Sequence, residues 1–439
     1  MKSLNDNKEK LTEIFTAYIR SGIKMSGDKS LGVEVEHFVL DDKTLESVPY
    51  SGEGGVKESV EKLMSLYPGA EAIVGEDFLG FTAKEFNVTL EPAAQIEISI
   101  IQSDDIELIG NIYRDFYDKL TGILKPLGQH LCTVGCQPVS HVDDLELIPK
   151  GRYRLMDAHF KKTGTGGREM MRGTASTQVS VDYTGEEDFR RKLQAAYYYM
   201  PLIKLVSDRV EAFQRDKVNV RLKRTDIWNR TDPARCGVLP GVFKPDYGFK
   251  DYAEYLCSVP LIFLPEEGGE RYTEFDTAPD LFEAPDHLQK ESEELCGADN
   301  CPPNNTLQKS SSERSERVRL TREYTEHVFS MPFPDVRVKR YLEIRGADAM
   351  PAEGVMFLCA LVKGLMYSEE VLDYVQECIK EKRLDENSVK ETEASLMQMG
   401  WEGRIYGISA REFLSDTLKR CEKNLSEEER KMIYGWDIL

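Results

Sequence analysis

The chain has 439 residues, of which 41% are hydrophobic, and it carries a formal net charge of −20. Nucleic acids and anionic membranes both require a positively charged surface, so neither is an expected partner, which leaves small molecules and proteins. The first residues, MKSLNDNKEKLTEIF, contain no apolar signal segment, and the most apolar stretch, 354–367, is too short to span a membrane. We expect a cytoplasmic protein that is a monomer or a homodimer.

Helical and strand-like segments follow one another without the regular rhythm of a doubly wound sheet, which favours an α+β fold. From the apolar spacing, the predicted helices cover 4–20, 56–67, 103–124 and 185–208, and the C-terminal part, 351–439, is mainly helical. Pro201 is expected to kink or interrupt its helix. The predicted strands cover 31–40, 91–100, 174–183 and 340–348.

Each predicted strand places acids, amides or an arginine at alternate positions. Side chains on a strand point to opposite faces with a period of two, so one face of the sheet collects the polar residues and the other collects valine, leucine and isoleucine. The polar set consists of Glu34, Glu36, Glu91, Gln95, Glu97, Gln178, Ser180, Asp182, Glu343 and Arg345.

Any one such strand is ordinarily a solvated sheet face. A solvated face in a chain with 31% charged residues should mix lysine with glutamate, yet 31–40, 91–100 and 174–183 contain no Lys or Arg. Clustered carboxylates resist joint ionisation unless positive charge is present, and Mg²⁺ with oxygen ligands is the usual source where phosphates also bind. The sequence therefore predicts a magnesium and nucleotide site on an antiparallel sheet.

One segment, 279–320, is polar and rich in Ser, Glu, Pro and Asn. Such a composition buries too little apolar area to order itself at low cost. We interpret it as a surface insertion or loop inside one domain, because the strand at 340–348 must return to the same sheet as the others. A linker between two domains is the alternative.

Seven segments are distinctive: LGVEVEHF, EPAAQIEIS, PKGRYRLM, GGREMMRGTASTQVSVDY, TDIWNRTDPARCGVLPGVF, DYAEYLCSVP and FPDVRVKRYLEIRGADAMP. Through these segments, which lie in the same order and cover most of the first 360 residues, the chain resembles the plant-type and proteobacterial glutamate–cysteine ligases. These are carboxylate–amine ligases with a glutamine-synthetase-like fold. The resemblance implies one catalytic domain over 1–439, with an antiparallel sheet curved around a central active-site funnel and helices on the outside.

The resemblance also implies roles for the polar residues. Two or three Mg²⁺ ions that bridge the phosphates of ATP would take oxygen ligands from Glu34, Glu36, Glu91, Gln95, Glu97, Gln178 and Glu343. The ATP itself would contact Gln178, Ser180, Asp182 and Arg345. Arg345 would stabilise the transferring phosphoryl group, where a fixed guanidinium meets spread negative charge. Glu97 or Glu91 would accept the proton of the attacking ammonium group.

Four arginines are candidates for the recognition of a substrate carboxylate. Arg224 matches a family arginine of this kind, and Arg152 and Arg154 are further candidates, with an ordinary structural role as the alternative. At Arg172 this chain reads MMRGT where the family commonly has MMFRT. A shift of one residue on a strand reverses the face to which a side chain points, so amino-acid recognition near Arg172 is the part of the pattern that departs from the family.

The implied reaction is a ligation in two steps. ATP phosphorylates the γ-carboxylate of glutamate, and the amine of cysteine then attacks the acyl phosphate, which gives γ-glutamylcysteine, ADP and phosphate. Three alternatives remain open: a ligase of the same family with another amine acceptor, glutamine synthetase with ammonia as the acceptor, and a non-enzymatic acidic metal-binding or scaffold protein.

Overall fold

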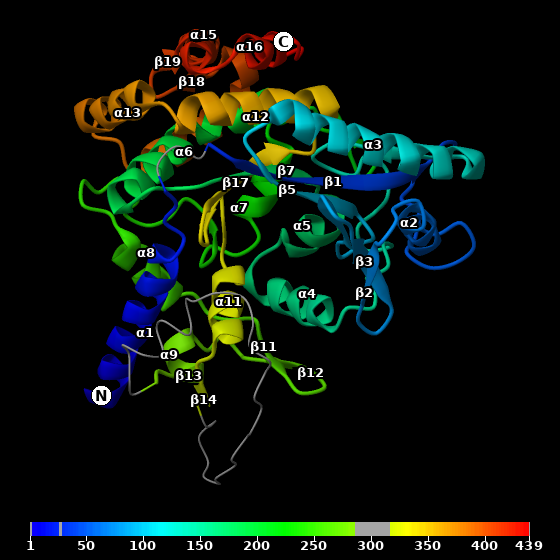
Figure 1. Ribbon diagram of the computed structural model, residues 1–439, viewed down its shortest axis with the longest axis horizontal. Coiled ribbons are helices and arrows are strands. Elements are labelled where there is room, and N and C mark those ends of the chain that lie inside the picture. The colour runs from blue at the N-terminus through cyan, green and yellow to red at the C-terminus, as the bar shows by residue number, and fades with distance from the viewer. Residues whose placement is uncertain (1, 26–28, 286–316, 439) are drawn as a thin grey trace.

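The computed structural model describes residues 2–25, 29–285 and 317–438. Its centre is a nine-stranded antiparallel sheet in the order β16-β17-β7-β1-β5-β4-β3-β2, and β6 pairs with the end of β1 (Figure 1). The strands are β1 (Leu31–Asp41), β2 (Glu71–Val74), β3 (Phe78–Thr82), β4 (Phe86–Leu90), β5 (Ile96–Ser103), β6 (Gln129–Cys132), β7 (Ser176–Val181), β16 (Val336–Val338) and β17 (Leu342–Asp348). The predicted α+β class is confirmed.

The register of the central strands aligns their polar positions. Glu36 of β1 lies opposite Glu97 of β5, and Glu34 lies opposite Gln178 of β7 on the other side. Ser180 of β7 lies opposite Glu343 of β17. Residues directly opposite on antiparallel strands point to the same face, so the predicted polar face exists as one surface.

The segment 91–100 differs from its prediction, because only its second half is a strand. Residues 91–95 form a turn between β4 and β5, closed by the bond from the Glu91 amide to the Gln95 carbonyl, with Ala94 at φ +64°. The pattern Glu-Pro-Ala-Ala-Gln contains a proline and requires one left-handed residue, which a regular strand does not accommodate. Glu91 and Gln95 therefore project from a turn at the edge of the polar face.

Helices cover the apolar face of the sheet. α3 (Ile106–Leu124) and α12 (Ala352–Met366) lie along it, and α6 (Glu186–Ser207) packs beside them (Figure 1). α6 runs on through Pro201, contrary to the predicted interruption. Most of this helix is buried, and such tertiary packing outweighs the one hydrogen bond that proline removes.

The C-terminal part is mainly helical, as predicted, and lies outside α12 (Figure 1). It contains α13 (Glu369–Lys382), α14 (Glu386–Met399), α15 (Ala410–Cys421), α16 (Glu427–Tyr434) and the short strands β18 (Arg404–Ile405) and β19 (Ile408–Ser409). One cluster of buried apolar side chains extends from Leu11 to Trp436, which supports the prediction of a single domain.

The remaining elements stand over the polar face and around the sheet. The helices on this side and around it are α1 (Lys2–Arg20), α2 (Val56–Met64), α4 (Gly151–Thr163), α5 (Gly167–Gly173), α7 (Lys223–Asn229), α8 (Phe249–Leu256), α9 (Ala278–Leu281) and α11 (Arg322–Ser330). The remaining strands are β8 (Ala212–Phe213), β9 (Asp216–Lys217), β10 (Cys236–Gly237), β11 (Phe263–Glu266), β12 (Gly269–Tyr272), β13 (Phe282–Glu283), β14 (Val318–Arg319) and β15 (Phe333–Pro334). Figure 1 shows α4, α5 and α7 on the side of the sheet opposite α3 and α12.

Within the predicted insertion 279–320, residues 286–316 lie outside the described part of the chain. Its two described ends meet, since Phe282 of β13 pairs with Val318 of β14. A segment that leaves and re-enters at one place supports an insertion over a domain linker. None of the described helices has the length and apolar character needed to cross a membrane.

Candidate active site

A cavity of about 110 Å³ lies between the polar face of the sheet and helices α4, α5 and α7. We call it the central cavity. Its lining consists of Glu36, Glu91, Pro92, Gln95, Tyr153, Met156, Met170, Met171, Thr174, Ser176, Arg224, Trp228, Phe333 and Arg345. Five residues predicted from the sequence are in this set: Glu36, Glu91, Gln95, Arg224 and Arg345. One side of the cavity is acidic, two arginines face it, and methionine and aromatic side chains complete it.

Glu34, Glu36 and Glu97 form what we call the acidic face. Burial and the neighbouring Glu343 raise the pKa of Glu34, and burial and Glu91 raise the pKa of Glu36 to about 7. Burial and the adjacent glutamates raise the pKa of Glu97 well above its ordinary value. These shifts have one cause, which is that several carboxylates share a partly dehydrated surface.

Neutral groups supply the hydrogen bonds of the acidic face. The Ser176 amide donates to Glu36 Oε2 at 2.7 Å, and the Thr89 hydroxyl donates to Glu97 Oε1 at 3.0 Å. Within residues 2–25, 29–285 and 317–438, none of the three carboxylates forms an ion pair. Cations with oxygen ligands fit this donor set. The same described residues contain no group of three or more His, Cys, Asp or Glu already placed to hold a metal ion.

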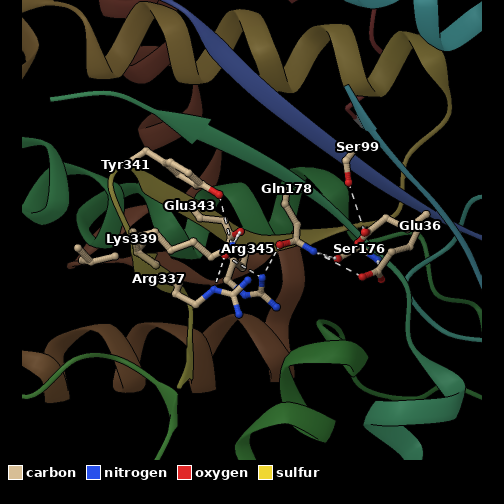
Figure 2. Close-up of polar contacts among 12 residues, drawn as sticks. Glu36, Ser99, Ser176, Gln178, Arg337, Lys339, Tyr341, Glu343 and Arg345 are labelled. Carbon is tan, nitrogen blue, oxygen red and sulfur yellow. Dashed lines mark hydrogen bonds and ion pairs between the residues drawn. The ribbon is translucent and has the colours of Figure 1, made fainter. Parts of the chain in front are cut away.

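Glu343 lies in a different environment, because three cations surround it (Figure 2). Arg337 Nε and Arg345 Nη1 contact Oε2 at 2.6 and 2.9 Å, and Lys339 Nζ contacts Oε1 at 3.2 Å. Burial alone would raise the pKa of Glu343, but these cations hold it well below its ordinary value. Both oxygens of Glu343 therefore already have cationic partners, unlike those of the acidic face.

Arg337 and Lys339 were missed by the sequence analysis. They lie on and just after β16, which pairs with β17 so that Arg337 is directly opposite Glu343. The signal was available in VRVKRYLEIR, where basic residues alternate with valine immediately before the strand that carries Glu343. Reading that segment as a hairpin would have placed them on the polar face.

Arg345 joins the cationic group to the acidic face. Its Nη1 donates to Gln178 Oε1 at 2.5 Å, and the Gln178 amide nitrogen is 3.5 Å from Glu36 Oε1 (Figure 2). Gln178 lies between an arginine and a glutamate, which fixes the direction of its amide. The charge on the polar face thus changes from negative at Glu36 to positive at Arg345, and Gln178 lies between them.

Gln95 holds the turn that carries Glu91. Its side-chain oxygen accepts from the Ala93 amide at 2.8 Å, and its amide nitrogen donates to the carbonyls of Met171 and Thr174 at 3.2 Å. These bonds attach the turn to α5 and the strand after it. The prediction that Gln95 ligates a metal stays untested, and its observed contacts are structural.

Glu91 meets a small polar cluster on α4. Tyr153 Oη donates to Glu91 Oε2 at 3.2 Å, and Lys150 Nζ lies 3.3 Å from the same hydroxyl. Arg152 lies over the ring of Tyr153, 5.2 Å from its centre. Burial and the adjacent Arg152 lower the pKa of Lys150 to about 8. Arg152 therefore reaches the cavity only through Tyr153, and Lys150 and Tyr153 are further residues that the sequence analysis did not select.

A second cavity of about 320 Å³ adjoins the sheet near Glu34. Ser180 and Asp182, both predicted to contact ATP, line it together with Ser99 and Tyr341. The side chain of Ser180 lies beside Gly32, whose missing side chain leaves the surface open at this point. Glu34 thus borders this second cavity, while Glu36 borders the central one.

Comparison with known proteins places these features in a family. The model of glutamate-cysteine ligase family 2 matches residues 30–435. The chain belongs to this family. A glutamate–cysteine ligase, chloroplastic, from Brassica juncea is 28% identical over 370 residues, which cover 83% of this chain and 65% of the relative. The corresponding protein of Arabidopsis thaliana is 28% identical, with 83% and 64% covered.

The chain spans about 65% of the length of these first relatives. Among solved structures, the glutamate–cysteine ligase of Francisella tularensis in complex with AMP superposes with a TM-score of 0.50 at 11% identity. The match covers 93% of this chain and 80% of that protein, and at this identity it supports the fold alone.

Besides Arg152, two further predicted substrate-binding arginines, Arg154 and Arg172, do not line the central cavity. Arg154 is exposed on α4 and pairs with Glu76 at 2.7 Å. Arg172 is buried, pairs with Asp157 at 2.9 Å and donates to the Leu145 carbonyl. The adjacent Gly173 explains the departure in MMRGT, since a Cβ there would lie 2.8 Å from Val142, and the arginine side chain turns to α4 instead.

Substitution of these two arginines should therefore leave substrate binding intact. We expect Arg154→Ala to change the free energy of unfolding by less than about 1 kcal/mol, because its ion pair is exposed. Arg172→Ala should cost about 2 kcal/mol, because it removes buried hydrogen bonds, including the one to the Leu145 carbonyl, while Asp157 keeps Lys161 as a partner. KM values of the folded protein measure the binding role, and thermal unfolding measures stability. A tenfold rise of KM in either variant would show that the substituted arginine does bind substrate, as the sequence predicted.

Proposed function

We propose that this chain is an ATP-dependent carboxylate–amine ligase that joins the γ-carboxylate of glutamate to the amine of cysteine. Membership of glutamate-cysteine ligase family 2 and the names of the relatives support this activity. The AMP in the Francisella tularensis structure supports a nucleotide as co-substrate. The observation that carries the proposal is the acidic face, whose three carboxylates form no ion pair within the described residues and keep raised pKa values although Arg345 lies nearby.

The donor set suits magnesium. Glu34, Glu36 and Glu97 would hold the ions, and Glu91, Gln95, Gln178 and Glu343 are the further candidates from the sequence. Bound Mg²⁺ supplies charge neutralisation of the phosphate oxygens and alignment of the reacting groups. We retain two or three ions as the expected number.

The side chains of the protein contribute to the reaction by orienting the substrates and by stabilising charge. Arg345, held by Glu343 and Gln178, is placed to bind oxygens of the phosphoryl group as it passes from ATP to the γ-carboxylate of glutamate. The amine then attacks the acyl carbon, the carbon–oxygen bond to phosphate breaks, and phosphate leaves with one oxygen of the former carboxylate. Glu97 or Glu91 would accept the proton that the ammonium group releases, and Glu91, which lines the central cavity and is bonded to Tyr153, is favoured if Glu97 holds an ion.

The two cavities fit separate substrates. Arg224 borders the central cavity with Trp228 beside it, and its guanidinium can pair with a substrate carboxylate. Three methionines and Phe333 provide an adaptable apolar surface for the amino-acid substrates. The second cavity is the proposed binding site of the nucleotide, because Ser180 and Asp182 line it.

Magnesium should change how stability depends on pH. The folded-state pKa of Glu36 lies near 7, above the ordinary 4.5, so the folded chain binds more protons than the unfolded chain between these values. Stability without metal should therefore fall as pH rises through this window. Mg²⁺ binds the ionised carboxylates and should raise the unfolding temperature more at pH 8 than at pH 5. Calorimetry with Mg²⁺ or EDTA measures this, and an equal effect at both pH values would contradict it.

An ADP-release assay tests the activity and its alternatives. With ATP, Mg²⁺ and glutamate present, cysteine should give the highest kcat/KM in a screen of amines. A different amine that exceeds cysteine would identify a ligase with another acceptor, and ammonia at comparable efficiency would indicate glutamine synthetase. Absence of any amine-dependent ADP release would favour the non-enzymatic metal-binding protein and defeat the proposal.

The domain organisation, the oligomeric state and the location remain proposals. The continuous apolar core and the paired ends of the insertion support one domain over 1–439. A monomer or homodimer is expected, with no nucleic-acid or membrane partner. The two plant relatives are named chloroplastic, so a cytoplasmic location for this chain stays a prediction.

A further inference from the structure

The backbone at Arg345 leaves the regular sheet. Ile344 pairs with Val179 and Ala347 with Thr177, so Arg345 and Gly346 together oppose the single residue Gln178 of β7. This is a β-bulge, a device that redirects a side chain and frees backbone groups from the ladder. The orientation of Arg345 therefore depends on what holds the bulge.

Two groups outside β7 hold it. The Arg345 amide donates to the Asp335 carbonyl at 2.9 Å. The Arg224 guanidinium donates to the carbonyls of Arg345 and Gly346 at 3.3 Å. Gly346 also lies directly against α6, since a Cβ there would be 2.2 Å from Met200 Sδ and 3.2 Å from Lys204 Cε. Because Gly346 has no side chain, the backbone of the bulge packs directly against the side chains of α6.

Asp335 is fixed in turn by a buried lysine. Lys204 Nζ of α6 contacts Asp335 Oδ2 at 2.9 Å and Glu393 Oε1 of α14 at 2.7 Å. The side chains of Lys204 and Glu393 are each 4% exposed, which removes them from solvent screening. The chain of contacts runs from α14 through α6 to the backbone of Arg345. A space of about 20 Å³ bordered by Lys204, Asp335 and Arg345 would be disturbed by any shift of this lysine.

We propose that Glu393 and Lys204 are positioning residues, which fix Asp335 and thereby the bulge that aims Arg345. This inference rests on the proposed function, because it assumes that Arg345 binds the transferring phosphoryl group. The helical C-terminal part would then contribute to catalysis indirectly, because Glu393 of α14 positions Arg345 through Lys204 and Asp335. Displacement of a reacting group by a small distance can cost as much as about a hundredfold in rate.

A double-mutant cycle on kcat tests this coupling. Glu393→Leu leaves the buried pair of Lys204 and Asp335 electrically balanced, so the fold should persist. We expect kcat to fall about tenfold with KM values nearly unchanged, and Glu393→Gln, which keeps an acceptor oxygen, to recover most of the loss. In an Arg345→Lys background, Glu393→Leu should cause no further loss of kcat, because the group that it positions is already gone.

The control is another acid that pairs with a basic residue of α6 but lies away from the site; its side chain is 74% exposed, whereas that of Glu393 is 4% exposed. Asp373 of α13 pairs with Arg191 of α6 at 2.8 Å, and Asp373→Leu should leave kcat unchanged. Asp335→Asn provides a second variant should Glu393→Leu fail to fold, with the same expected dependence on Arg345.

The outcomes separate this inference from the proposed function. Equal losses of kcat in the native and Arg345→Lys backgrounds would show a general structural effect and overturn the positioning role, as would an unchanged kcat in Glu393→Leu. A normal kcat in Arg345→Lys alone would instead remove the role of Arg345, and with it both the proposed phosphoryl contact and this inference.

Discussion

Arg345→Met should lower kcat for ADP release about a thousandfold. A guanidinium that stabilises a transferring phosphoryl group contributes roughly that much, and no other described cation is placed to bridge the cationic group and the acidic face as Arg345 does. Glu343 would keep its contacts with Arg337 and Lys339, so the substitution leaves no buried carboxylate without a partner. Stopped-flow or coupled assays at saturating substrate measure the loss.

The matched control is Arg340→Met. Arg340 precedes the same strand, but its Nη2 donates to the Ser21 carbonyl at the end of α1, away from the central cavity. Its kcat should stay within about twofold of the native value, with any loss confined to thermal stability. A native-like kcat in Arg345→Met, with the fold intact, would remove Arg345 from the mechanism.

Glu36→Gln and Glu97→Gln should each lower kcat/KM for ATP at least about a hundredfold and, without magnesium, stabilise the protein. The activity falls because a ligand for cations is lost. Stability rises because the amide keeps the shape of the side chain while it removes a charge that its neighbours repel, as the raised pKa values of both carboxyls indicate. Activity and stability moving in opposite directions distinguish a functional carboxylate from a structural one.

Glu71→Gln is the control for the acidic face. Glu71 lies on β2 of the same sheet and is exposed, so neither activity nor unfolding temperature should change appreciably. Loss of stability in Glu36→Gln and Glu97→Gln, with activity retained, would identify both as ordinary structural residues.

The arrangement of the polar face followed from the sequence because strand geometry leaves little freedom. A period of two assigns Glu34 and Glu36 to one face of β1, and burial of valine on the other face prevents a slip of register. The absence of basic residues in three of the strands then predicted a magnesium and nucleotide site, which stays a prediction. Burial and neighbouring carboxylates raise the pKa of Glu36 and Glu97, although Arg224 and Arg345 act in the opposite direction on Glu36.

Other parts depended on contacts that no local pattern encodes. Arg154 and Arg224 are both arginines on short helices over the polar face, and only tertiary packing decides that one pairs with Glu76 and the other borders the cavity. Lys339 was overlooked because the predicted strand begins at residue 340, directly after it, although its partner Glu343 was found. The turn at Glu91 was misread because its polar residues happen to continue the period of the following strand.

The fate of the carboxylate oxygens of glutamate tests the central claim most directly. Glutamate with isotopically heavy oxygen in its γ-carboxylate should be incubated with the protein, ATP, Mg²⁺ and cysteine, and the products weighed by mass spectrometry. The account predicts γ-glutamylcysteine that retains one heavy oxygen and phosphate that has gained the other, in equal amounts. Phosphate that contains only ordinary oxygen would show that the γ-carboxylate is never phosphorylated, and would contradict the account.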